Sequence, residues 1–152
     1  MSNLRVISIV EGTAVDGPGL RTAIYLAGCR HQCPGCHNPS TWDFGAGEEM
    51  SVDRIMEIVL DNGFNVTLTG GDPAYSAEAL LPLVQRIRRA GLTVWMYTGF
   101  TYPQLEHVPG MAQLLPYLEA IVDGPYVEAL RDPNLHFRGS SNQNIVYIGT
   151  EN

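Results

Sequence analysis

The stretch that decides which fold to expect is residues 65–73, which read NVTLTGGDP. Its first five residues are typical of a β-strand, and the Gly-Gly-Asp-Pro turn ends that strand, because glycine and proline interrupt regular pairing. A helix is expected next, up to about residue 90, with Pro82 either in its first turn or kinking it. Residues 92–97 form the next expected strand. The sequence therefore predicts a strand, a helix and a second strand in succession.

Strand and helix signals of the same kind alternate along the rest of the chain. Ser51 can cap a helix that ends near residue 63, since apolar side chains recur on one face of this segment. Strands separated by helical segments indicate βαβ units, and therefore an α/β fold with a mainly parallel sheet. The other expected strands are 5–10, 21–27 and 120–123, with a last apolar run at 144–148 and short helical stretches at 103–108 and 111–118.

The length of the chain limits how large this fold can be. With 152 residues, of which 45% are hydrophobic, the chain is expected to form a single domain, 1–152, with a buried core. A complete eightfold barrel needs about 250 residues, so we expect a partial, open β/α barrel. Sites in such folds lie on loops at the carboxyl ends of the strands. Here those loops are 29–36, 70–73, 98–99 and 123–124.

Charge and hydropathy argue against several classes of function. The formal net charge of −7 disfavours binding to nucleic acid or to an anionic membrane surface. The longest apolar runs, such as 23–27 and 55–60, are far too short to span a bilayer, and no targeting segment is recognised. We therefore expect a cytoplasmic protein with neither nucleic acid nor membrane among its partners.

All three cysteines of the chain, Cys29, Cys33 and Cys36, lie close together. Their odd number and the absence of a secretory signal argue against a disulfide framework. A cubane iron–sulfur cluster normally takes one thiolate per iron, so three thiolates leave one iron open to bind a small molecule. Alternatively, the three thiolates and either His31 or His37 could complete a structural zinc site. The cysteine spacing alone leaves both interpretations open.

Several motifs resemble a known family. Cys29-x3-Cys33-x2-Cys36 after one strand, and Gly-Gly-Asp-Pro after a later strand, resemble the radical S-adenosylmethionine superfamily. Within it, DGPGLR and HNPSTW, at residues 16–21 and 37–42, resemble the activases of glycyl-radical enzymes. The likeness runs from about residue 10 to residue 143. Four further segments resemble the branch that acts on anaerobic ribonucleoside-triphosphate reductase: 97–100 (YTGF), 122–126 (VDGPY), 130–133 (LRDP) and 137–143 (FRGSSNQ).

The resemblance implies a fold and a set of cofactors. The fold would be a partial, open β/α barrel of the radical S-adenosylmethionine type. Cys29, Cys33 and Cys36 would hold a [4Fe-4S] cluster whose fourth iron binds the amino and carboxylate groups of S-adenosylmethionine. Gly70 and Gly71 would let the backbone approach the methionine end closely. The other residues implied to bind this cofactor are Gly35, Cys36, His37 and Asp72.

Two segments carry less definite implications. Asp72 stands where much of the superfamily has glutamate, although aspartate is usual in the reductase-activating branch. It can therefore cap the segment that follows rather than touch the ligand. Residues 138–143 match the same branch, which suggests a site or a docking role without assigning one.

The resemblance also implies an activity. One electron from the reduced cluster would cleave S-adenosylmethionine to methionine and a 5′-deoxyadenosyl radical, which would take hydrogen from a glycine Cα of the class III reductase and leave a glycyl radical there. Reduced flavodoxin is the implied electron donor. The cofactors supply this chemistry and the protein positions them, so no side chain is assigned as catalytic.

Two alternatives remain open. One is an activase of another glycyl-radical enzyme, such as pyruvate formate-lyase, although those chains are generally longer. The other is a non-enzymatic, zinc-binding interaction module. Metal analysis after anaerobic purification separates the second from the cluster protein.

Overall fold

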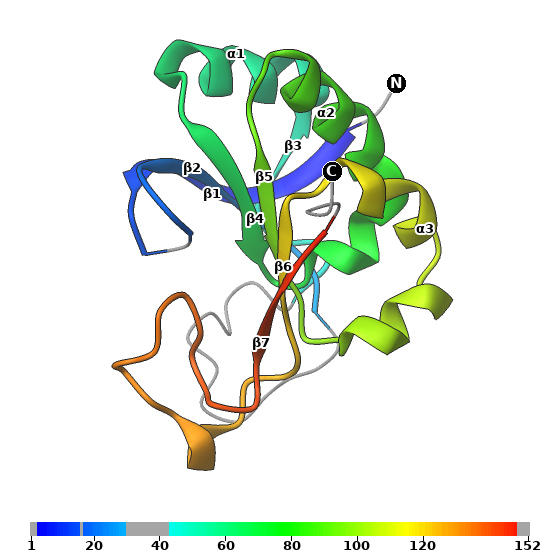
Figure 1. Ribbon diagram of the computed structural model, residues 1–152. Helices are drawn as coiled ribbons and strands as arrows, with labels where there is room; N and C mark the ends of the chain where they lie inside the picture. The colour runs from blue at the N-terminus through cyan, green and yellow to red at the C-terminus, as the bar shows by residue number, and fades with distance from the viewer. Residues whose placement is uncertain (1–2, 16, 30–42, 149–152) are drawn as a thin grey trace.

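The computed structural model describes residues 3–15, 17–29 and 43–148. Within these residues the strands form one seven-stranded sheet in the order β3-β1-β2-β4-β5-β6-β7 (Figure 1). The strands are β1 (Asn3–Thr13), β2 (Arg21–Leu26), β3 (Glu48–Ser51), β4 (Asn65–Gly70), β5 (Val94–Tyr97), β6 (Ala120–Asp123) and β7 (Asn144–Tyr147). The helices are α1 (Val52–Asn62), α2 (Ala77–Arg89) and α3 (Met111–Leu114), with short 3-10 helices η2 (Pro73–Ser76), η3 (Tyr102–His107), η4 (Leu115–Tyr117) and η5 (Glu128–Leu130).

The sheet is mixed, so the expectation of a mainly parallel sheet in an open β/α barrel of the radical S-adenosylmethionine type is wrong. Parallel pairing joins β2 to β4, β4 to β5 and β5 to β6. Antiparallel pairing joins β1 to β2, β1 to β3 and β6 to β7. A barrel requires strands and helices to alternate along the chain. Within the described residues, they alternate in this way in the central part alone.

The connections between strands explain this difference. Residues 14–20 join β1 to β2, and such a short loop forms a hairpin, because a parallel crossover needs a dozen or more residues. Between β6 and β7 the chain is longer, but its only helical element within the described residues is η5. Strand β7 therefore returns antiparallel beside β6.

Most of the expected elements are confirmed, and the differences are local. Strand β3 was not expected, because its sequence EEMS has no apolar alternation; it pairs with the amino-terminal half of β1. The helical stretch expected at 103–108 is the 3-10 helix η3, and the one at 111–118 divides into α3 and η4. Pro82 lies inside α2 rather than in its first turn.

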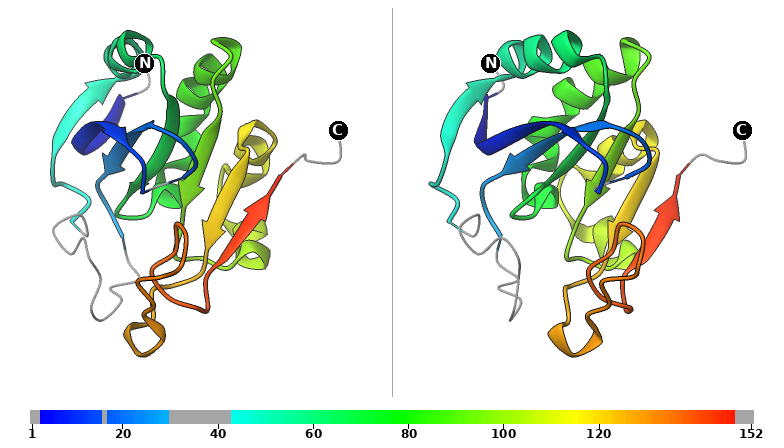
Figure 2. Two further views of the ribbon diagram at one scale, coloured as in Figure 1. Left: turned by 60° about the vertical axis from the view of Figure 1, so that its left-hand side comes forward. Right: turned by 90° about the vertical axis from the view of Figure 1, so that its left-hand side faces the viewer.

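The helices cover one face of the sheet (Figure 2). Alternate strand residues such as Ile24, Leu68 and Met96 are fully buried there, in the same core cluster as Ile55 of α1 and Leu83 of α2. Burying a side chain of this size stabilises the fold by about 1.5–3 kcal/mol. This face is therefore the main hydrophobic core.

The opposite face carries polar and aromatic side chains. The Arg21 guanidinium is buried, donates from Nε to Thr67 Oγ1 at 2.9 Å, and lies 5.7 Å from the centroid of the Trp95 ring. Phe137, from the loop between β6 and β7, meets the same indole edge-on at 5.5 Å. The residues that face away from the helices are thus partly covered by that loop.

In the parts of the chain that the structure describes, none of the helices combines the length and the apolar character needed to cross a membrane.

The caps of α1 and α2 give a test of this fold. Ser51 Oγ accepts a hydrogen bond from Arg54 N at 3.1 Å at the start of α1, whereas Ser76 precedes α2 without a side-chain cap bond. We predict that Ser51→Ala lowers the free energy of unfolding by about 1 kcal/mol, because it leaves a helix N–H without its acceptor. Ser76→Ala, the matched control, should change it by less than half as much in urea titrations. Equal losses would contradict the assigned caps.

Candidate functional site

The carboxyl ends of the parallel strands meet at one edge of the sheet, where a cavity of about 610 Å³ opens. Cys29 follows β2, Gly70 ends β4 and Gly71 follows it, Thr98 and Gly99 follow β5, and Gly124 follows β6. All of these residues line the cavity. Parallel strands place their carboxyl ends side by side, so segments far apart in the sequence meet here.

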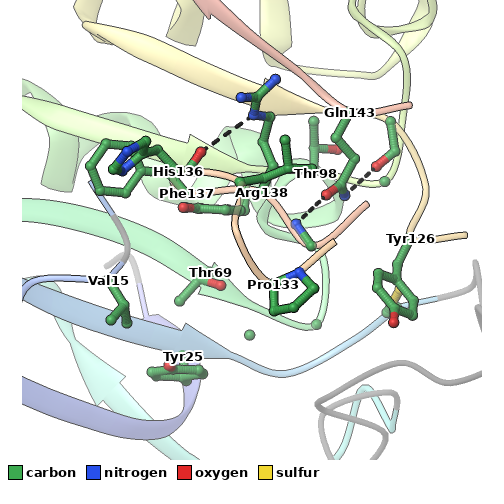
Figure 3. Close-up of a pocket in the computed structure, with 18 of the residues that line it drawn as sticks. Val15, Tyr25, Thr69, Thr98, Tyr126, Pro133, His136, Phe137, Arg138 and Gln143 are labelled. Carbon is green, nitrogen blue, oxygen red and sulfur yellow. Dashed lines mark hydrogen bonds between the residues drawn. The ribbon is translucent and has the colours of Figure 1, made fainter. Parts of the chain in front are cut away.

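Side chains from the sheet face and from the chain before β7 form the other walls of the cavity. Figure 3 shows Thr69 between Tyr25 and Val15 on one side and the segment from His136 to Arg138 on the other. Val15 belongs to the connection between β1 and β2, and its side chain is largely exposed. The walls therefore combine aromatic rings, a hydroxyl, an imidazole and a guanidinium.

At Gly70 the backbone of β4 faces that of β2 with no room for a side chain. Its φ is +105°, and a Cβ at this position would lie 2.4 Å from Leu26 N and 2.5 Å from Leu26 O. Gly71 N donates to the same Leu26 carbonyl at 2.8 Å. Only glycine fits this position without moving backbone, and the turn consequently presents main chain to the cavity.

Asp72 lies behind this turn and is not among the residues that line the cavity. Its side chain is 1% exposed. Oδ1 accepts from Ala74 N at 3.0 Å, so Asp72 caps η2. Oδ2 accepts from Thr98 Oγ1 at 3.0 Å and from Gly99 N at 2.9 Å. Asp72 thus joins the turns that follow β4 and β5.

The segment from residue 138 to residue 143 is held by side-chain amides. Gln143 Oε1 accepts from Gly139 N at 2.8 Å and from Ser140 N at 3.2 Å, and its Nε2 donates to Gly124 O at 3.0 Å. Asn142 Nδ2 donates to Pro125 O at 2.8 Å. This segment therefore shapes the cavity wall by bracing the chain that leads from β6 to β7.

Phe137, next to that segment, has a φ of 61°, which is uncommon for a residue other than glycine. Its ring packs on Trp95, and the residue also lines the cavity. The unusual backbone conformation thus coincides with the point where this loop is anchored to the sheet.

The residues expected to form the site divide into two groups. Cys29, Gly70 and Gly71 line one cavity. Asp72 does not line it, but accepts a hydrogen bond from Thr98, which does. The remaining ones, Cys33, Gly35, Cys36 and His37, lie outside the described residues, as does His31 of the alternative zinc site. Among the described residues no three metal-ligating side chains gather. The three-cysteine ligand set therefore stays a prediction.

Several wall residues were missed by the sequence analysis. Tyr25, Thr69 and Tyr97 stand on the strand positions that face away from the helices, and His136 carried no chemical signal in the sequence. Side chains alternate between the two faces of a strand, so Thr67 and Thr69 share one face of the sheet. The same alternation along β2 and β5 would have placed Tyr25 and Tyr97 on that face. No comparable signal in the sequence pointed to His136.

Comparison with known proteins adds to this geometry. Residues 15–146 match the family model described as a 4Fe-4S single cluster domain. The chain is therefore an iron–sulfur protein with one such domain.

Three relatives are named anaerobic ribonucleoside-triphosphate reductase-activating protein. The one from Vibrio cholerae is 37% identical over 86% of this chain and 90% of its own length. The one from Escherichia coli K12 is 36% identical over 88% and 92%, and the one from bacteriophage T4 is 33% identical over 86% of each chain. The chain belongs to the family of anaerobic ribonucleoside-triphosphate reductase-activating proteins.

The close approach at Gly70 gives a second test. We predict that Gly70→Ala destabilises the protein by at least about 1 kcal/mol more than Gly63→Ala, measured by urea unfolding. Both glycines have positive φ, which costs an alanine about 1–2 kcal/mol, but at Gly63 nothing lies within 4 Å of the added methyl group. Similar losses for the two variants would show that the backbone of β2 yields to the added atom.

Proposed function

We propose that this protein activates anaerobic (class III) ribonucleoside-triphosphate reductase by generating its glycyl radical, through reductive cleavage of S-adenosylmethionine at a [4Fe-4S] cluster. The observation that carries the proposal is that Cys29 and the Gly70-Gly71 turn line the same cavity. The family membership and the names of the relatives support the choice of reductase.

Cys29, Cys33 and Cys36 are the proposed cluster ligands. The donor set suits such a cluster, because thiolates are its usual ligands and three of them leave one iron open. Cys29 fits this role, since it is partly buried at the wall of the cavity, three residues after the end of β2. When bound and reduced, the cluster supplies the electron that cleaves S-adenosylmethionine.

S-adenosylmethionine is the proposed occupant of the cavity. A cavity of about 610 Å³ falls within the range of small-molecule sites. The turn at Gly70 and Gly71 offers backbone groups to the polar methionine end, and Asp72 contributes by holding this turn. Gly35, Cys36 and His37 are the proposed contacts of the nucleotide end.

The chain's own residues bind and orient in this proposal and take no part in bond breaking. Tyr25 and Tyr97 flank Thr69 on the sheet face and limit the access of water to the bound ligand from that side. The braced segment that ends at Gln143 closes the opposite wall. The glycine-bearing segment of the reductase enters from the open side. Residues 1–152 act as a single domain, with a reduced flavodoxin as the proposed electron donor.

The first test is electron paramagnetic resonance on protein reconstituted anaerobically with iron and sulfide and then reduced. We expect a reduced-cluster signal that changes when S-adenosylmethionine is added, and formation of 5′-deoxyadenosine. A glycyl-radical signal should appear when the reductase is included. Bound zinc, with no cluster and no 5′-deoxyadenosine, would refute the proposal and return the cysteines to a structural role.

The ligand set is tested by substitution. We predict that Cys33→Ala abolishes 5′-deoxyadenosine formation and lowers the iron content, because two thiolates hold the cluster less firmly than three. His107→Ala is the control: His107 is an exposed residue of η3 that does not line the cavity, and this variant should retain both iron and activity. Cleavage that persists in Cys33→Ala would contradict the cysteine assignment.

A further inference from the structure

A second, smaller hydrophobic cluster lies on the face of the sheet opposite the helices. Its buried and partly buried members are Trp95, Ala120, Val122, Tyr97, Phe137 and Ile145. Trp95 is 0% exposed and does not line the cavity, whereas Tyr97 and Phe137 do line it. The cluster therefore joins the interior of the sheet to residues of the cavity wall.

The Trp95 indole contacts one side chain from each of two segments that lie far apart in the sequence. The Arg21 guanidinium lies over the ring, 5.7 Å from its centroid, and Arg21 begins β2. The Phe137 ring meets the indole edge-on at 5.5 Å, from the chain between β6 and β7. One buried ring is thus in contact with both segments.

Arg21 carries this contact to the connection between β1 and β2. Its Nη1 donates to Pro18 O at 3.1 Å, and a Cβ on Gly17 would lie 2.8 Å from Arg21 Cδ. The arginine side chain therefore packs directly against the backbone of this connection. Val15 of the same connection lines the cavity, across from the segment that contains Phe137 (Figure 3). The position of this wall is linked in this way to the guanidinium that lies on the indole.

On the other wall, the contact with Trp95 supports an unusual backbone conformation. Phe137 has a φ of 61°, where a residue other than glycine is strained. Such a conformation persists when the surrounding packing holds it, and the ring contact with Trp95 supplies packing of this kind. Its neighbours His136 and Arg138 line the cavity. Removal of the indole would therefore let the Phe137 backbone relax and move these two side chains.

We propose that Trp95 is a positioning residue for the protein substrate: its ring fixes the two walls relative to the sheet, and so sets the opening through which the glycine-bearing segment of the reductase enters. This rests on the proposed function. The floor of the cavity, where the ends of β2, β4 and β5 meet, is held by bonds of the glycine turn and Asp72 that do not involve Trp95. A change at Trp95 should therefore affect hydrogen transfer from the reductase more than cleavage of S-adenosylmethionine.

Met96 provides a matched control. It is the next residue of β5, it is also 0% exposed, and it packs in the main core under the helices. Trp95→Leu and Met96→Ala both remove buried apolar volume, so both are expected to lower the thermal stability to a comparable extent. Only the first removes a contact with the cavity walls.

The test compares these variants as full chains reconstituted with iron and sulfide, with and without the reductase. Because a displacement of about 1 Å can reduce a rate about a hundredfold, we expect Trp95→Leu to lower the ratio of glycyl radicals to 5′-deoxyadenosine at least about fivefold. Met96→Ala should keep this ratio within about twofold of wild type. A merely structural loss lowers both products together. An unchanged ratio in Trp95→Leu, or an equal fall in both variants, would overturn the proposal.

Hydrogen exchange separates this inference from the proposed function, because it needs neither cofactor nor reductase. In the full chain before reconstitution, amides at 17–21 and 135–140 should exchange faster in Trp95→Leu than in Met96→Ala. Equal exchange would overturn the positioning role. A wild-type protein that forms no 5′-deoxyadenosine would refute the proposed function, while faster exchange in these two segments would still support the role of Trp95 in holding the walls.

A second pair of variants covers the case in which Trp95→Leu fails to fold. Phe137→Leu removes the ring that meets Trp95, whereas Phe64→Leu removes another partly buried ring, which does not line the cavity. Phe137→Leu should raise exchange at 135–140 above that of Phe64→Leu. Equal exchange in the two variants would overturn the proposal.

Discussion

The backbone conformation of Gly70, with a φ of +105° that would direct a side chain against Leu26 of β2, is the constraint on which the site depends. Gly70 pairs with Leu26 in the parallel register. A Cβ on residue 70 would collide with the Leu26 backbone, so only glycine fits there. Gly71 then bonds to the Leu26 carbonyl, and Asp72 bonds to the Gly28 carbonyl. Main-chain bonds with the glycine turn therefore hold the backbone up to Gly28, the residue that precedes Cys29.

The mixed topology contributes to this arrangement. Because β7 runs antiparallel to β6, the chain between them leaves and returns at the same edge of the sheet, which is the edge where the cavity lies. A parallel return would have required this chain to cross to the opposite edge. The antiparallel pairing thus leaves residues 124–143 available to form a wall of the site.

The sequence predicted which strand ends meet better than it predicted the shape of the sheet. Glycine, proline and cysteine mark where strands end, so the loops at 29–36 and 70–73 could be assigned to one edge once parallel central strands were expected. The direction of the outer strands is not encoded in their apolar alternation, because parallel and antiparallel strands share a two-residue period. The residues of β3 have no apolar alternation that would indicate a strand. This segment is a strand because it pairs with β1, which its own residues do not specify.

The role of Asp72 shows why burial is hard to deduce from one sequence. An aspartate before proline predicts a cap, and the bond to Ala74 N agrees with that. The contacts with Thr98 and Gly99 depend on β4 and β5 being neighbours, which no local pattern specifies.

The same reasoning applies to residues 138–143. Their glycine and polar side chains are typical of an exposed loop, yet the structure uses Gln143 and Asn142 to bond the backbone around Gly124 and Pro125. The floor of the cavity is joined by main-chain bonds and one buried carboxylate, whereas this wall is joined by side-chain amides. The floor and this wall therefore differ in the kind of hydrogen bond that holds them.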